Sequence, residues 1–100
     1  MKSLFLVTAA AIAFGAASPA LATGKMTCNA GPQSGWKSQP ALKAALVKQG
    51  WQVRKSKVDG GCYEVYGTDP QGNRVEAYFH PVSFKMLLSS RRGEVLYKAN

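Results

Sequence analysis

The feature that most constrains the fold is a β-hairpin encoded by residues 60–81, GGCYEVYGTDPQGNRVEAYFHP. Its turn is Asp69-Pro70-Gln71-Gly72-Asn73. Aspartate suits the first position of a type I turn, proline fixes φ at the second, and glycine supplies the left-handed residue that closes a three-residue loop with a bulge. The turn therefore places Asp69 opposite Asn73 and fixes the register of both strands.

This register sorts the hairpin side chains onto two faces of a sheet. One face carries the mainly apolar set Tyr63, Val65, Gly67, Val75, Ala77 and Phe79. The other carries Cys62, Glu64, Tyr66, Glu76, Tyr78 and His80. A slip of one residue would place Val65 opposite Glu76 and mix the faces, so the hydrophobic pattern and the turn chemistry predict the same pairing.

Residues 1–22 have the pattern of a secretory signal peptide, with a basic start at Lys2, an apolar run over residues 4–17 and a break at Pro19. Ala20-Leu21-Ala22 offers small residues at the positions that a signal peptidase reads, which predicts cleavage before Thr23. An uncleaved membrane anchor is the alternative. We expect a periplasmic or secreted protein without a transmembrane segment after cleavage, and a mature chain, residues 23–100, that forms one small domain.

The mature chain contains two cysteines, Cys28 and Cys62, and small exported domains use paired cysteines chiefly for disulfides. A bridge closing a loop of this length would stabilise the domain by about 4 kcal/mol in the chain-entropy model. A metal site with His80 as third ligand and a redox pair are the alternatives. The first lacks a fourth ligand at close spacing, and the second lacks the Cys-x-x-Cys motif.

The helix of the domain is predicted from Ser38 to about Gln49. Residues 23–35 ahead of it are small, polar and without periodicity, which indicates an N-terminal arm. Ser38 suits the N-cap and a proline follows in the first turn. Apolar residues at 42, 45 and 46 form a helical stripe, and Gly50 ends the helix as a left-handed cap.

A strand is predicted over residues 51–58, with Trp51 and Val53 on one face and Gln52 and Arg54 on the other. Its lysine-rich second half is typical of an edge strand. After Pro81, residues 86–90 and 94–97 suggest a second short hairpin or a strand and a tail, with a helical turn as the alternative. For residues 36–100 we predict an α+β fold in which one helix packs on a three- to four-stranded antiparallel sheet.

This arrangement resembles the PepSY domain, in its small periplasmic form, from about Cys28 to Lys85. The resemblance rests on Gly50-Trp51, on the run KVDGGCYEVY at 57–66, on residues 69–72 and on residues 75–81. The family usually leaves its last strand through Asp-Pro-x-Thr-Gly, where this chain has His80-Pro81-Val82-Ser83-Phe84. The resemblance implies a helix packed on an antiparallel sheet and a regulatory role without catalysis, as in metallopeptidase propeptides. It brings no catalytic residues.

The residue inventory also argues against an enzyme. No zinc-peptidase, phosphate-loop or serine-hydrolase motif is present. Glu64 and Glu76 share a face and could be imagined as a glycosidase pair, but two carboxylates on the open sheet of a small domain are typically solvated. We predict no catalytic residue, no metal ligand and no cofactor.

The sheet face away from the helix is the candidate binding face. It is predicted to display Arg54, Glu64, Tyr66, Glu76, Tyr78 and His80. Aromatic and charged groups of this kind are enriched at protein interfaces. In the alternative interpretation, the N-terminal arm covers part of this face.

Charge indicates the kind of partner. The whole chain has a net charge of +8 at pH 7, and about +7 once Lys2 is removed. This favours acidic proteins or anionic envelope surfaces, while export argues against nucleic acid. Our first hypothesis is a regulatory module, such as a peptidase modulator or inhibitor, that docks a protein through its sheet face, an edge strand or its basic patch. The second is an accessory protein of an envelope cytochrome, or a metal or heme binder, that uses His80 or the tyrosines.

Overall fold

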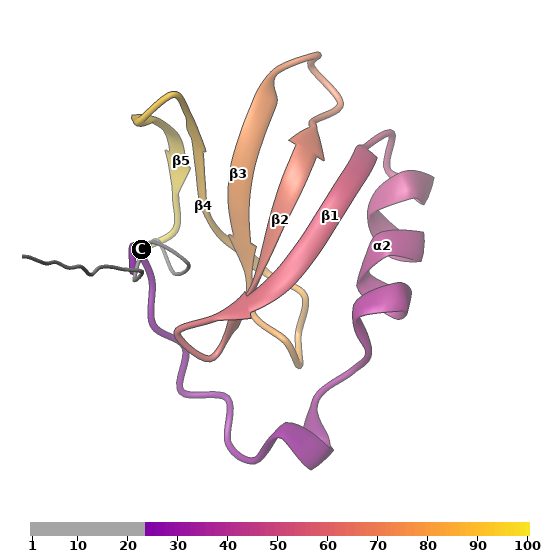
Figure 1. Cartoon of the computed structure of the whole chain (residues 1–100), viewed down its shortest axis with the longest axis vertical. Helices are drawn as coiled ribbons and strands as arrows, with labels where there is room; N and C mark the ends of the chain where they lie inside the picture. Colours follow the sequence, from indigo (N-terminus) through magenta and orange to yellow (C-terminus); the bar gives the residue numbers. More distant parts are fainter. Residues whose placement is uncertain (1–23) are drawn as a thin grey trace, which may run out of the picture.

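The computed structural model describes residues 24–100, so the predicted signal peptide and its cleavage site lie outside the described residues. The elements in chain order are the 3₁₀ turn η4 (Gln33–Gly35), helix α2 (Gln39–Lys48) and strands β1 (Gln52–Asp59), β2 (Cys62–Thr68), β3 (Arg74–Phe79), β4 (Met86–Arg91) and β5 (Glu94–Lys98). The strands form one antiparallel sheet in sequence order, and α2 lies beside β1 (Figure 1). No helix in residues 24–100 is long and apolar enough to cross a membrane.

The central hairpin, β2 and β3, has the register predicted from its turn. Tyr63 pairs with Phe79, and Tyr66 pairs with Glu76. Within the turn, the Asp69 amide donates to the Asn73 carbonyl at 2.9 Å, and the carboxylate of Asp69 accepts from the Asn73 amide at 2.9 Å. Turn chemistry and strand alternation therefore specify this hairpin together.

Helix α2 begins and ends as predicted. The Ser38 hydroxyl accepts a hydrogen bond from the Ala41 amide at 3.1 Å, and Gly50 has a φ of 102° just after the helix. The buried core between α2 and one face of the sheet consists of Leu42, Leu46, Trp51, Tyr63, Val65, Val75, Ala77 and Phe79. The face of the sheet with Tyr63 and Phe79 is thus the one that packs on the helix.

The sheet has five strands rather than the predicted three to four. The second hairpin is formed by β4 and β5, and its two turn residues Arg92 and Gly93 both have positive φ, as a tight two-residue hairpin turn requires. The second short hairpin predicted over residues 86–90 and 94–97 is therefore confirmed, although all five residues of β5 are exposed.

The predicted disulfide between Cys28 and Cys62 is confirmed. It fixes the arm, which passes the β1–β2 turn on its way to α2 (Figure 1), and the Cys28 amide donates to the Gly60 carbonyl at 2.7 Å. On the sheet face away from α2, Cys62, Tyr78 and Leu88 form a second, smaller buried cluster with Met26, Cys28 and Leu87 packed against it. The arm therefore covers the part of this face that lies nearest to the disulfide.

The turn after β3 contains a left-handed residue that is not glycine. Phe84 occupies that position with a φ of 64°. Its amide donates to the His80 carbonyl at 2.8 Å, and its ring packs against the main core with the Lys37 ammonium 5.0 Å from the ring centre. The packing of the Phe84 ring therefore offsets the cost of its left-handed backbone conformation.

Candidate functional site: an arginine-lined groove

An open groove of about 760 Å³ lies on the sheet face away from α2, between the β2–β3 turn and the β4–β5 turn. It is lined by Arg54, Tyr66, Gly72, Asn73, Arg74, Val75, Glu76, Ser90, Arg91, Arg92 and Glu94. Four of these residues are arginines and two are glutamates, so the lining has an excess of positive charge. We call this surface the arginine groove.

A β-bulge in β1 places Lys55 on the face of the groove together with Arg54. The pairing of β1 with β2 skips Arg54: Val53 pairs with Gly67, and Lys55 pairs with Tyr66. Because a bulge inserts one extra residue into the strand, Arg54 lines the groove while the next residue, Lys55, still lies over the Tyr66 ring. Two consecutive cations therefore lie on the same face of β1.

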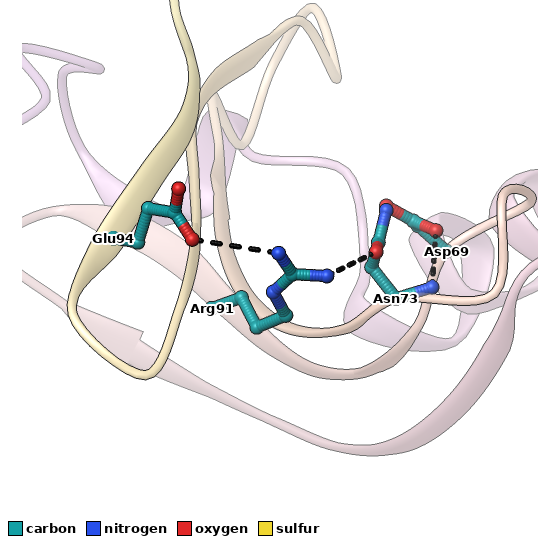
Figure 2. Close-up of polar contacts among 4 residues, drawn as sticks. All are labelled: Asp69, Asn73, Arg91 and Glu94. Atoms are coloured by element: carbon teal, nitrogen blue, oxygen red, sulfur yellow. Dashed lines mark hydrogen bonds and ion pairs between the residues drawn. The ribbon is translucent and has the colours of Figure 1, made fainter.

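Arg91 is held in place by both turns that bound the groove. Its guanidinium donates to the Asn73 side-chain oxygen at 2.8 Å and forms an ion pair with Glu94 at 3.4 Å (Figure 2). Asn73 in turn donates to the Asp69 carboxylate at 3.2 Å. This chain of contacts connects the β2–β3 turn with the β4–β5 turn.

The other three groove arginines, Arg54, Arg74 and Arg92, are exposed. Their guanidinium groups make no hydrogen bond or ion pair with the described part of the chain. Arg91 is thus neutralised within the fold, while three guanidinium groups remain available to an anionic ligand.

Tyr66 forms the aromatic part of the groove and carries cations on its ring. The ammonium groups of Lys55 and Lys57 lie 4.7 Å and 5.6 Å from the ring centre, within the range of cation–π attraction. Burial and the neighbouring Glu64 carboxylate raise the pKa of Tyr66, so its phenol keeps its proton near neutral pH.

Glu64, which we expected on the exposed face, is fully buried beside the groove. Its carboxylate lies 3.8 Å from the Lys57 ammonium. Burial raises the pKa of Glu64, although Tyr66 and Lys57 oppose that shift. The carboxylate therefore belongs to the structural support of the face and cannot contact a ligand directly.

Tyr78, also expected on the exposed face, is buried as well. It packs with the disulfide and the arm, and its hydroxyl donates to Asp59. His80 follows the end of β3 and accepts from the Val82 amide at 3.1 Å. Of the six predicted face residues, the groove therefore brings together Arg54, Tyr66 and Glu76.

The remaining groove residues, chiefly Asn73, Arg74, Arg91 and Arg92, were not predicted as a site. The basic residues among them were visible in the sequence as contributors to charge. Their convergence depends on two turns that lie far apart in the chain, and no local motif encodes such an approach.

The excess of arginine in the groove suits the binding of anions. Among residues 24–100, no group of three or more histidine, cysteine, aspartate or glutamate side chains could hold a metal ion. Arginines favour planar carboxylates, which they can bind through two parallel hydrogen bonds.

A comparison with protein families matches residues 6–89 to the model described as peptidase propeptide and YPEB domain, known as PepSY. No curated protein and no solved structure matches the chain. The match covers most of the sequence, including the helix, the central hairpin and most of β4. The chain therefore belongs to the peptidase propeptide and YPEB domain family.

Proposed function

We propose that this protein is a non-catalytic regulatory module of the periplasm or of the secreted fraction, and that it docks an acidic segment of a partner protein in the arginine groove. The observation that carries the proposal is that three exposed guanidinium groups, without an ionic partner among residues 24–100, line one open groove together with Tyr66. Arginine and tyrosine are the residue types most enriched at the energetic centres of interfaces. Membership in the PepSY family suggests a secreted peptidase as the partner.

The sheet face is a better docking surface than either edge of the sheet. The pairing of edge strand β1 is interrupted by the bulge at Arg54, and the pairing of edge strand β5 is interrupted opposite Ser89 and Ser90. Strand β1 also carries Lys55 and Lys57. Bulges and lysines are the devices by which proteins discourage the addition of a further strand.

A metal or heme role for His80 has no structural observation in its favour. Its Nδ1 atom accepts from two backbone amides, those of Val82 at 3.1 Å and Ser83 at 3.4 Å. This nitrogen is therefore engaged in the turn, and we propose a single function.

The test is a titration of the ¹⁵N-labelled mature chain with a synthetic peptide in which glutamate alternates with serine, followed by NMR. We expect saturable shifts at the amides of Tyr66, Arg74 and Arg92, and weaker binding at higher salt. The double variant Arg54→Gln/Arg74→Gln should weaken binding about tenfold, because two exposed ion pairs of up to about 1 kcal/mol each are lost.

The matched control is Lys43→Gln/Lys48→Gln, which removes the same charge from exposed positions on α2. This control should leave the affinity within about twofold, since only long-range attraction is lost. Equal weakening by both double variants, or shifts spread over the whole surface, would show that net charge rather than the groove binds the peptide. Either result would overturn the proposal.

A further inference from the structure

A second hollow of about 310 Å³ adjoins the arginine groove on the same face of the sheet. It is lined by Lys25, Met26, Leu88, Ser90, Gly93, Val95 and Lys98. Ser90 lines both hollows, and the β4–β5 turn contributes Arg92 to the groove and Gly93 to the second hollow. The two hollows therefore form one continuous surface along β4 and β5.

The second hollow differs in chemistry from the groove. Its apolar lining comes from Met26 of the arm, Leu88 of β4 and Val95 of β5, and Val95 is 56% exposed. No acidic residue lines it, while Lys25 and Lys98 supply two ammonium groups. A suitable occupant is thus apolar in its middle and negatively charged beside it.

One wall of this hollow depends on the arm. Met26 and Lys25 lie just before Cys28, which is bonded to Cys62 and hydrogen-bonded to Gly60. The hollow is therefore fixed by the same crosslink that holds the arm on the sheet. The second hollow is thus a fixed feature of the folded face and not a gap beside an unattached segment.

From this continuity we infer that the partner segment is bipartite. Acidic residues lie in the arginine groove, and the segment continues along β4–β5 to place one large aliphatic side chain in the second hollow, with a carboxylate beyond it near Lys25 and Lys98. This inference rests on the proposed function, since it specifies the partner of the same site. Both hollows carry positive charge, and Ser90 lines both of them, so a single acidic peptide segment that runs from one to the other is the occupant we infer.

The experiment uses three kinds of peptide, five molecules in all, and the disulfide-bonded mature chain. The first peptide carries only the acidic serine-glutamate run. The second extends this run with leucine followed by glutamate, and the third replaces that leucine with serine. Both extensions are made at either end of the run, because the direction of the bound segment follows from the result.

At one of the two ends of the acidic run, the leucine extension should tighten binding about tenfold relative to the serine extension. Partial burial of a leucine side chain changes the dissociation constant by roughly this factor. The added shifts should appear at the amides of Met26, Leu88 and Val95. The variant Val95→Ser should abolish the tenfold gain and leave the affinity for the purely acidic peptide unchanged. The matched control Leu96→Ser, at an exposed β5 position outside the hollow, should preserve the gain.

The outcomes separate the two proposals. Equal affinity of leucine and serine peptides in both directions would refute the apolar anchor while leaving the arginine groove intact. Absence of binding by every peptide would refute both proposals. The inference would be overturned if laurate bound saturably in the second hollow and removed the leucine-dependent shifts, while the leucine and serine peptides of equal charge bound with the same affinity. A lipid would then be the occupant of the second hollow.

Discussion

The Tyr78 hydroxyl donates a hydrogen bond to Asp59 Oδ2 at 2.7 Å, and both residues are buried. The same carboxylate oxygen accepts from the Gly24 amide of the arm at 3.3 Å. Through these two hydrogen bonds, one carboxylate oxygen connects β3, the end of β1 and the arm. Burial and this hydrogen bond raise the pKa of Tyr78, so the phenol stays protonated and remains a donor.

Replacing Tyr78 with phenylalanine should lower the free energy of unfolding by about 1–3 kcal/mol, because it removes a donor from a buried carboxylate. Tyr63→Phe is the control, since the Tyr63 hydroxyl donates to the neutral Lys37 carbonyl at 2.7 Å. That loss should be smaller, about 0.5–1.5 kcal/mol. Urea unfolding measures both values. A smaller loss for Tyr78→Phe than for Tyr63→Phe would show that the bond to the Asp59 carboxylate stabilises the fold no more than a bond to a neutral carbonyl does.

Glu64 gives the fold a defined pH dependence. Its pKa is raised in the folded state by burial, so the folded chain binds more protons than the unfolded chain between the unfolded pKa, about 4.3, and the raised folded value. The stability that this carboxyl contributes is therefore fully present below the unfolded pKa and is lost as the pH rises through the folded pKa.

Glu64→Gln should remove this loss. The difference in unfolding free energy, variant minus wild type, should increase from about pH 4 towards neutrality. Glu94→Gln, at an exposed carboxyl, controls for the removal of one negative charge. A difference that decreases as the pH rises would mean that the Lys57 ammonium outweighs burial and lowers the Glu64 pKa in the fold.

The central hairpin could be predicted residue by residue because two independent signals agreed there. The turn set the register, and the alternation of side chains from Tyr63 to Phe79 allowed only that register. The disulfide followed from the cysteine count in a small chain expected to be exported. Local chemistry was sufficient in both cases.

Strand β1 was harder to interpret because its bulge changes the alternation. Before Arg54, odd-numbered residues such as Val53 pack towards the core, whereas after it Ser56 and Val58 pair with Val65 and Tyr63 on that face. The segment therefore looked polar on both faces in the sequence. The same shift turns the lysines of β1 towards Tyr66, which no regular alternation predicts.

The candidate site could be predicted only in part. Arg54, Tyr66 and Glu76 follow from the alternation of β1 and of the central hairpin. Arg91, at the end of β4, and Arg92, in the β4–β5 turn, come from a second hairpin whose place beside β3 is specified by no local pattern. The burial of Glu64 also depends on neighbours from other strands. Contacts between turns that are distant in the chain are tertiary contacts, and secondary-structure propensity and hydrophobic periodicity carry no information about them.

Gly67 explains why β1 can bulge where it does. A Cβ atom at this position would collide with the backbone carbonyl oxygen of Gln52 and lie 3.2 Å from the Val53 Cα. Gly67→Ala should therefore force β1 away from β2 and destabilise the domain by at least about 2 kcal/mol. Thermal unfolding followed by circular dichroism measures the effect.

Gly35→Ala serves as the control for Gly67→Ala, because a Cβ at Gly35 would meet nothing within 4 Å. Its effect should stay within about 0.5 kcal/mol. A Gly67→Ala variant as stable as this control would show that β1 can move away without cost, and that the close approach of the two backbones is not required.

Two substitutions of Phe84, which has a left-handed backbone conformation, separate the effect of backbone strain from that of side-chain packing. Phe84→Ala keeps the positive φ of 64° and loses the ring that packs on the core, so it should be the least stable form. Phe84→Gly loses the same ring but relieves the strain, and it should be more stable than Phe84→Ala by about 1 kcal/mol. The control is Val95, which lies in strand β5. There Val95→Ala should be more stable than Val95→Gly, because glycine relieves no strain in a strand and costs chain entropy. Urea unfolding of the four variants measures both pairs, and an alanine form at position 84 as stable as the glycine form would contradict the presence of strain in this turn.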